Sequence, residues 1–217
     1  MTTEGRNIFV AGQTGTGKTY YVRHAIAQAR RYVVYQTKRE DTSYPGVVFD
    51  GMADGRSDWR LMLAWWHRCR SAGLPWRLVY RPRDKWDVGE FDRLCRMVYA
   101  AGDCVLVAEE IAAYLTGRLF QTTGRGTGIK SLLTAGRTRG VVAYWITQRC
   151  HNIPREVTSE SREAALFALR EPSDIEYVRE RFGYTAAARM ALLQRYQYVH
   201  WREGGSATTY RAEIETV

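Results

Sequence analysis

The chain has 217 residues, of which 45% are hydrophobic and 25% charged, a composition that excludes a disordered or fibrous protein and predicts one domain over residues 1–217. No apolar run approaches the roughly 18 residues that cross a bilayer, and the cysteine and histidine spacing matches neither a disulfide framework nor a zinc site, so we expect a soluble protein with reduced thiols. The formal charge of +9 comes mainly from arginine and is compatible with a polyanionic partner or with a solvated basic surface.

Apolar strands alternate with helices in the first part of the chain. A strand over residues 7–11 leads into a Gly-rich loop and a helix over 18–30. Runs of β-branched and aromatic residues predict buried strands over residues 31–36 and 47–49. This alternation is typical of a parallel sheet.

The middle of the chain continues the alternation. Ser57 is the expected N-cap of a helix that ends near Arg70. The inner face of this helix is expected to consist of four apolar residues, Leu61, Leu63, Ala64 and Trp65. A strand over residues 76–80, an amphipathic helix over 90–101 and a strongly apolar strand over 104–108 follow.

The last part of the chain starts with a polar, Gly-punctuated stretch over residues 116–128, which we expect to be an exposed loop. The later elements are, in order, a helix over 130–138, a strand over 141–147, a short helix over 155–161, a strand over 165–169, helices over 172–182 and 185–194, and a terminal hairpin of 196–202 and 208–213. Together the elements predict an α/β fold with a mostly parallel sheet, helices on both faces and ligands at the carboxyl edge.

The loop between the first strand and the first helix matches G-x-x-x-x-G-K-[ST], the P-loop signature. It consists of Gly12, Gln13, Thr14, Gly15, Thr16, Gly17, Lys18 and Thr19. The glycines let backbone N–H groups converge on phosphate oxygens, Lys18 reaches the β- and γ-phosphates, and Thr19 can bind Mg²⁺. The strand and the helix on either side separate this match from a chance Gly-rich turn. We therefore predict that the loop binds ATP and Mg²⁺.

A second motif is the apolar strand that ends in two carboxylates, the pattern of a Walker B element. We expect Glu109 to bind Mg²⁺, directly or through water, and Glu110 to polarise the attacking water. The alternative is that both acids cap a helix over residues 111–115. The first acid is usually Asp, so an exchange of the two roles stays open.

Two further candidates flank the strand over residues 141–147. Gln148 follows its apolar end, next to the acidic strand, and is the candidate sensor of the γ-phosphate, with a plain strand terminator as the alternative. Arg137, or else Arg139, is a candidate arginine finger that crosses a subunit boundary and stabilises the transition state. A solvated or nucleic-acid-binding arginine is the alternative.

The order of these motifs resembles the FtsK/HerA superfamily of ring-forming, DNA-pumping ATPases. The motifs that carry the resemblance are the P-loop, the acidic pair, G-R-x-x-G, T-Q-x(5)-P and the segment over residues 170–178. The compact length is similar to that of genome-packaging ATPases of tailless icosahedral viruses with an internal membrane. The resemblance spans residues 8–202 and implies a RecA-like core, a homomeric ring, often a hexamer, and double-stranded DNA threaded through it. It also implies a capsid vertex or membrane protein as partner, and a place in the host cytoplasm or at the packaging vertex of the virion.

Two features depart from the family pattern: Glu109 replaces the commoner Asp, and an insertion over residues 51–102 has no clear counterpart. We predict an ATP-driven translocase of double-stranded DNA that packages a viral genome. The alternatives are a filamentous-phage-type morphogenesis ATPase, a P-loop kinase, and a DNA-binding scaffold that uses ATP only for assembly.

The Gly-rich stretch after the acidic pair contains candidate DNA contacts. Arg118, Arg125 and Lys130 would hold phosphates in the pore, or belong to an ordinary solvated loop. Tyr114 and Phe120 lie in or beside the same stretch, and for both we favour packing in the core.

Overall fold

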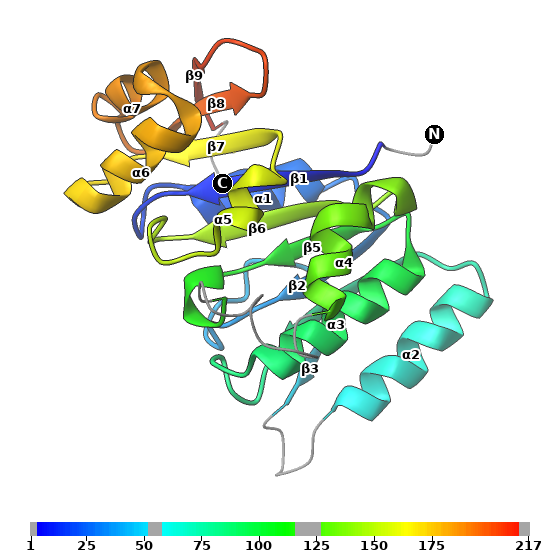
Figure 1. The fold of residues 1–217 in the computed structure, drawn as a ribbon. Helices are drawn as coiled ribbons and strands as arrows, with labels where there is room; N and C mark the ends of the chain where they lie inside the picture. The colour runs from blue at the N-terminus through cyan, green and yellow to red at the C-terminus, as the bar shows by residue number, and fades with distance from the viewer. Residues whose placement is uncertain (1–3, 52–57, 116–126, 213–217) are drawn as a thin grey trace.

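The computed structural model describes residues 4–51, 58–115 and 127–212, and Figure 1 shows a central sheet with helices on both faces. The strands are β1 Arg6–Ala11, β2 Arg31–Tyr35, β3 Val47–Asp50, β4 Trp76–Arg81, β5 Val105–Ala108, β6 Val142–Thr147, β7 Glu163–Phe167, β8 Gln197–Arg202 and β9 Thr208–Arg211. The α-helices are α1 Lys18–Ile26, α2 Trp59–Ser71, α3 Val88–Ala101, α4 Thr127–Ala135, α5 Arg155–Ser159, α6 Pro172–Phe182 and α7 Tyr184–Met190. Short 3-10 helices cover Ile111–Ala113 and Gly136–Arg139.

The strands pair in the order β3-β4-β2-β5-β6-β1-β7-β8-β9. The pairs from β3 to β7 are parallel, and β8 and β9 form an antiparallel hairpin at one end. The predicted α/β class, the mostly parallel sheet and the terminal hairpin are confirmed. Because β4 lies between β3 and β2, the stretch over residues 51–102 supplies a strand of the central sheet.

Alternate side chains of the strands face two separate hydrophobic layers. In β1, Phe9 belongs to the larger layer and Val10 to the smaller one. α1 covers the smaller layer through Val22 and Ile26, whereas α2, α3 and α4 cover the larger layer on the other face. Helices on both faces explain why the strands read as continuous apolar runs.

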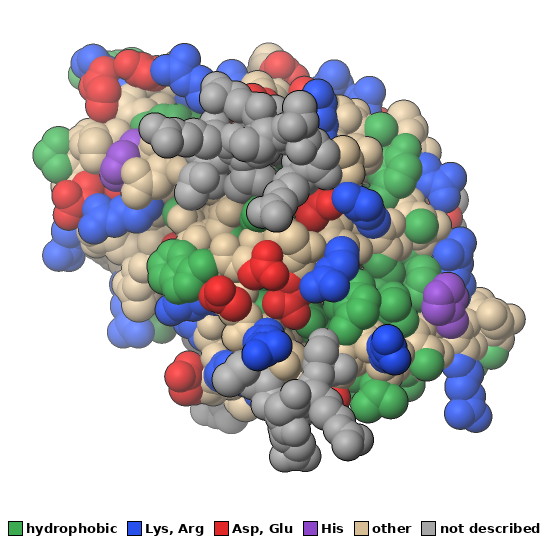
Figure 2. All heavy atoms as spheres, turned by 60° about the horizontal axis from the view of Figure 1, so that its bottom comes forward, with side chains coloured by type: hydrophobic (Ala, Val, Ile, Leu, Met, Phe, Trp, Pro, Cys, Tyr) green, Lys and Arg blue, Asp and Glu red, His purple; other side chains and the backbone are tan. Residues whose placement is uncertain are grey.

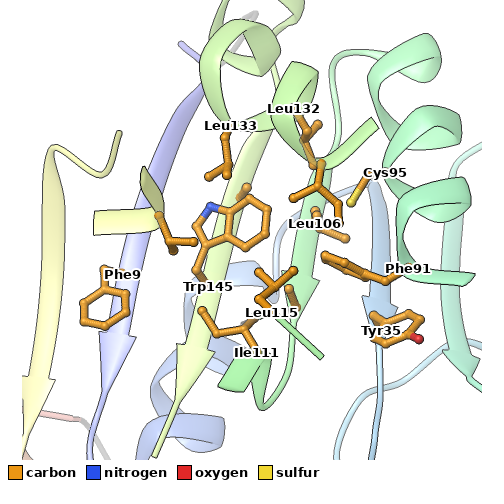
Figure 3. Packing of buried hydrophobic residues seen from close by; sticks show 14 of the residues in the cluster. Phe9, Tyr35, Phe91, Cys95, Leu106, Ile111, Leu115, Leu132, Leu133 and Trp145 are labelled. Carbon is orange, nitrogen blue, oxygen red and sulfur yellow. The ribbon is translucent and has the colours of Figure 1, made fainter. Parts of the chain in front are cut away.

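Trp145 lies in the middle of the larger layer, as Figure 3 shows. Its fully buried ring packs edge-on against Phe91 of α3, with ring centroids 6.2 Å apart. Its indole N–H donates a 3.0 Å hydrogen bond to Asn7 Oδ1, and the Asn7 amide donates one of 2.8 Å to the Leu133 carbonyl. These bonds satisfy the buried polar groups and tie β6, β1 and α4 together.

The buried face of α2 differs from the prediction. Met62, Trp66 and Cys69 are buried, at the i, i+4, i+7 spacing of one helical face. Leu61 and Ala64 are exposed, and Leu63 and Trp65 pack only at the margin. The prediction was wrong because residues 63–65 are consecutive and cannot share one side of a helix. The predicted cap Ser57 lies outside the described residues, and α2 begins after Asp58.

Element boundaries differ by a few residues elsewhere. The helix predicted over residues 130–138 is α4, which begins three residues earlier, followed by a 3-10 turn. The helices predicted over 18–30 and 185–194 end sooner, at Ile26 and Met190. β7 begins and ends two residues before the predicted strand. None of these differences moves a motif to another element.

Candidate nucleotide-binding site

The sheet order brings three motifs together at the carboxyl edge. β6 lies between β1 and β5, so the P-loop after β1, the acidic pair after β5 and Gln148 after β6 meet at neighbouring strand ends. They line one pocket, to which the predicted residues contribute Thr14, Gly15, Gly17, Lys18, Thr19, Glu109, Glu110 and Gln148. This is the place where open α/β sheets bind their ligands.

The P-loop has the backbone shape that phosphate binding requires. Gly17 has φ 113°, and a Cβ there would lie 2.8 Å from the ring of Tyr196, so a side chain is excluded by both conformation and space. A Cβ on Gly12 would lie 2.4 Å from Cβ of Phe167. The loop ends at the first turn of α1, where free backbone N–H groups are available to an anion.

Lys18 is buried and folds back on its own loop. Its ammonium donates hydrogen bonds of 2.6 Å to the Gly12 carbonyl and 2.9 Å to the Gln13 carbonyl. Burial lowers the pKa of Lys18 to about 8, although the Glu110 carboxylate opposes the shift. A bound triphosphate would supply negative charge and favour the ammonium form.

Glu109 is a buried carboxylate, 6% exposed, with one oxygen lacking a hydrogen-bond partner among the described residues. Burial raises its pKa to about 7, and the negative charge of Asp41 adds to the shift. A hard cation beside the carboxylate would relieve both the unmet oxygen and the desolvation. Glu109 together with Thr19 therefore fits an Mg²⁺ ion accompanying the nucleotide.

Gln148 connects the P-loop to the second acid. Its side-chain amide donates a 2.6 Å hydrogen bond to Glu110, and the Thr14 hydroxyl donates one of 2.7 Å to the amide oxygen of Gln148. The Gln148 backbone N–H also points to the Glu110 carboxylate, at 3.3 Å. Glu110 makes no side-chain cap bond to the following 3-10 helix, so its carboxylate faces the pocket instead of capping that turn.

Arg137 lies at the opposite edge of the sheet from its own P-loop. It belongs to the 3-10 turn before β6, hence to the amino edge, and it lines a separate cavity with Asn7 and Glu160. Arg139 is on the same turn and donates to the Tyr99 and Ala100 carbonyls. Within one chain, neither arginine joins the pocket, so an arginine finger would have to act on a neighbouring subunit.

The candidate DNA contacts are only partly described. Lys130 is an exposed side chain of α4, whereas Arg118 and Arg125 lie outside the described residues. In Figure 2, basic side chains are spread over the visible face and alternate with acidic ones instead of forming one continuous patch. Tyr114 is buried, as favoured, and donates to the Glu109 carbonyl at 3.0 Å, whereas Phe120 also lies outside the described residues.

Two residues near Glu109 have no signal in the sequence. Lys38 lines the pocket after β2, and its charge lowers the pKa of both Lys18 and Glu109. Tyr44 is buried beside Glu109, and the pKa of its phenol is raised by burial and by that carboxylate. Both come from the loop between β2 and β3, which belongs to no motif and reaches the acids only because β2 pairs with β5.

A parallel sheet with this loop and these acids defines the fold of a P-loop NTPase. Neither a protein-family model nor a curated protein matches the chain. Among solved structures, the genome-packaging NTPase B204 from Sulfolobus turreted icosahedral virus 2 in complex with AMPPCP is similar, with TM-score 0.74 and 17% identity over 98% of this chain and 100% of that chain.

Two further structures are similar at lower scores. VirB4 of Thermoanaerobacter pseudethanolicus has TM-score 0.58 and 11% identity over 96% of this chain and 90% of that chain. EssC, ATPases 2 and 3, from Geobacillus thermodenitrificans has TM-score 0.53 and 10% identity over 99% of this chain and 41% of that chain. These likenesses confirm the P-loop NTPase fold that the expected resemblance implies. Within the described residues, no helix is both long and apolar enough to span a bilayer.

Proposed function

We propose that the chain is an ATPase that couples ATP hydrolysis to translocation of double-stranded DNA, and that it packages a viral genome. The observation that carries the ATPase part is the joining of Lys18, Glu110 and Gln148 in one pocket. The packaging part is supported by the similarity to the genome-packaging NTPase B204, which covers 98% of this chain and 100% of that chain.

The residues predicted from the motifs each have a role in the proposed hydrolysis of ATP. The P-loop N–H groups and the Lys18 ammonium hold the β- and γ-phosphates. Thr19 and Glu109 would hold Mg²⁺, which would supply positive charge to the phosphate oxygens. Glu110 orients a water molecule for in-line attack and accepts its proton, so that an O–P bond forms to the γ-phosphorus while the bond to the bridging oxygen breaks and ADP leaves.

Gln148 holds the Glu110 carboxylate in this account. Its amide bonds to Glu110 on one side and to Thr14 on the other, so a γ-phosphate that displaces Thr14 would alter the position of the water-orienting group. An acid fixed toward the pocket favours water as the acceptor of the phosphoryl group. A kinase would require an acceptor site for another substrate and less of this carboxylate.

In this proposal, more than one subunit takes part in translocation. We propose a homohexameric ring in which Arg137 of one subunit enters the pocket of the next. The position of Arg137 at the amino edge, away from its own pocket, supports a role in trans. Double-stranded DNA would pass through the ring, with Arg118, Arg125 and Lys130 among its contacts. A capsid vertex or membrane protein would be the partner of the ring. The ring would act at the packaging vertex of the virion or in the host cytoplasm.

ATP turnover with and without duplex DNA tests this proposal, alongside a native mass measurement of the assembled species. We expect a ring whose ATPase activity rises with duplex DNA. Turnover that ignores DNA but transfers phosphate to an acceptor would favour a kinase. A Glu110→Gln variant that still assembles, binds DNA and functions like the wild type would favour a scaffold that uses ATP only for assembly.

A further inference from the structure

The segment that joins α7 to β8 lies against the P-loop and has no role in the account above. We propose that Tyr196 of this segment, together with Arg195 and Tyr20, forms the binding site for the base of the nucleotide. The inference rests on the proposed function, in that the P-loop binds the phosphates of a nucleoside triphosphate.

The sheet order decides where the nucleoside must go. Glu110 and Gln148 follow β5 and β6, which lie on one side of β1, so the γ-phosphate must point to that side. The nucleoside is attached at the other end of the phosphate chain and leaves the loop on the opposite side of β1. β7 and β8 lie there, and Tyr196 directly precedes β8.

Direct contacts hold the segment on the phosphate loop. The Tyr196 backbone N–H donates a 3.0 Å hydrogen bond to the Thr16 carbonyl, and the Arg195 guanidinium donates one of 3.3 Å to the Gly15 carbonyl. The Tyr196 ring lies so close to Gly17 that a Cβ there would be 2.8 Å from it. The ring therefore lies beside the start of α1, where the phosphate chain of a bound nucleotide would end and the nucleoside would begin.

The backbone of Tyr196 is strained. Its φ is 66°, a left-handed conformation that bulky side chains rarely adopt. Hydrogen bonds at both its backbone N–H and its carbonyl keep the residue in this conformation, since the carbonyl accepts a 2.8 Å hydrogen bond from the Ala212 N–H. Glu110, with φ 49°, is likewise strained and lines the pocket. Strain of this kind persists where a side chain must be presented in one position.

The side chains offer flat surfaces for a base. The Tyr20 and Tyr196 rings meet edge-on with centroids 6.4 Å apart, and the Arg195 guanidinium lies 4.8 Å from the centre of the Tyr196 ring. Both rings are partly exposed, and Arg195 is exposed. Rings and guanidinium planes stack on the π-face that every base has. The site should therefore accept any nucleoside triphosphate and favour purines, whose face is larger.

Calorimetric titration of the full chain with ATP and with inorganic tripolyphosphate, both with Mg²⁺, distinguishes the contribution of the base to binding from that of the phosphates. Tyr196→Asn removes the ring but keeps a residue that tolerates positive φ. We expect it to weaken ATP binding about tenfold and to leave tripolyphosphate binding unchanged. Tyr196→Phe keeps the ring and should bind ATP like the wild type, as should Tyr184→Ala, which removes an exposed ring on α7.

Tripolyphosphate also reports on the integrity of the loop, because it requires the folded P-loop. An equal loss of ATP and tripolyphosphate binding in both Tyr196→Asn and Tyr20→Ala would mean that the rings only support the loop, and the proposal would be overturned. Unchanged ATP binding in both variants would overturn it as well. A wild type that binds neither compound would contradict the nucleotide site itself, whereas a selective loss of ATP without any hydrolysis would keep the base site and contradict the ATPase.

Discussion

The side-chain amide of Gln148 donates a 2.6 Å hydrogen bond to the carboxylate of Glu110, across the gap between the ends of β6 and β5. The Thr14 hydroxyl bonds to the same amide from the P-loop. The P-loop and the second acid are thus joined through one side chain, which gives the candidate sensor a physical means of action.

Gln148→Ala removes both bonds and should lower kcat at least about tenfold with little change in KM, because the acid is no longer held in position while the phosphate contacts remain. Steady-state release of phosphate measures both constants. Thr14→Val is the matched control, since it breaks only the bond to the loop and should have the smaller effect. Equal kcat in Gln148→Ala and the wild type would remove Gln148 from the mechanism.

Substitutions of the two carboxylates should have different effects, one on hydrolysis and the other on Mg²⁺-dependent binding. Glu110→Gln should bind ATP with Mg²⁺ almost normally and hydrolyse it very slowly, because an amide cannot accept the proton of the water. Glu109→Gln should instead weaken the dependence of ATP binding on Mg²⁺. Titrations of ATP with and without Mg²⁺, beside single-turnover assays, distinguish the two. The reverse pattern would exchange the roles of Glu109 and Glu110.

The nucleotide-free chain should lose stability as the pH rises past the ordinary range of a carboxylate. Burial raises the Glu109 pKa from 4.5 to about 7, so between these values the folded chain binds more protons than the unfolded chain. The contribution of Glu109 to the free energy of unfolding is fully present below about pH 4.5 and is lost as the pH rises through about 7. The loss is on the order of 3 kcal/mol.

Urea unfolding at pH 5 and pH 8 measures this contribution, with Glu109→Gln as the neutral control. The wild type should lose more stability than the variant between the two values, and the variant should be the more stable at pH 8. The same loss in both proteins would show that Glu109 does not titrate in this range.

The amino-edge position of Arg137 leads to a prediction about mixed rings. Arg137→Ala leaves its own P-loop intact, while Lys18→Ala leaves its arginine intact, so each variant alone should be inactive. A mixture should recover part of the ATPase activity, because some interfaces combine an intact P-loop with an intact arginine. Native mass spectrometry must show that mixed rings form. Normal turnover by Arg137→Ala alone would contradict the arginine finger, and Arg139 would be tested next.

Local motifs predicted much of the fold and part of the pocket. The P-loop lies between a strand and a helix whose residues are neighbours in sequence, and the acids end a continuous apolar strand, so both could be placed without knowing the sheet order. Each of these depends on residues close together in the chain.

The parts that escaped prediction depend on pairing between distant segments. Lys38 and Tyr44 reach Glu109 only because β2 pairs with β5, and no local pattern specifies that pairing. Tyr196 meets Thr16 across 180 positions of the chain. The prediction of the buried face of α2 was wrong because apolar residues lie on more than one side of this helix.

The central claim is that ATP hydrolysis moves this protein along duplex DNA, and displacement of a third strand from a DNA triplex tests it most directly. The wild type with ATP and Mg²⁺ should release the third strand, while Glu110→Gln should bind the same DNA and ATP without releasing it. ATP hydrolysis at an equal rate with and without duplex DNA, together with a triplex that stays intact, would contradict the claim.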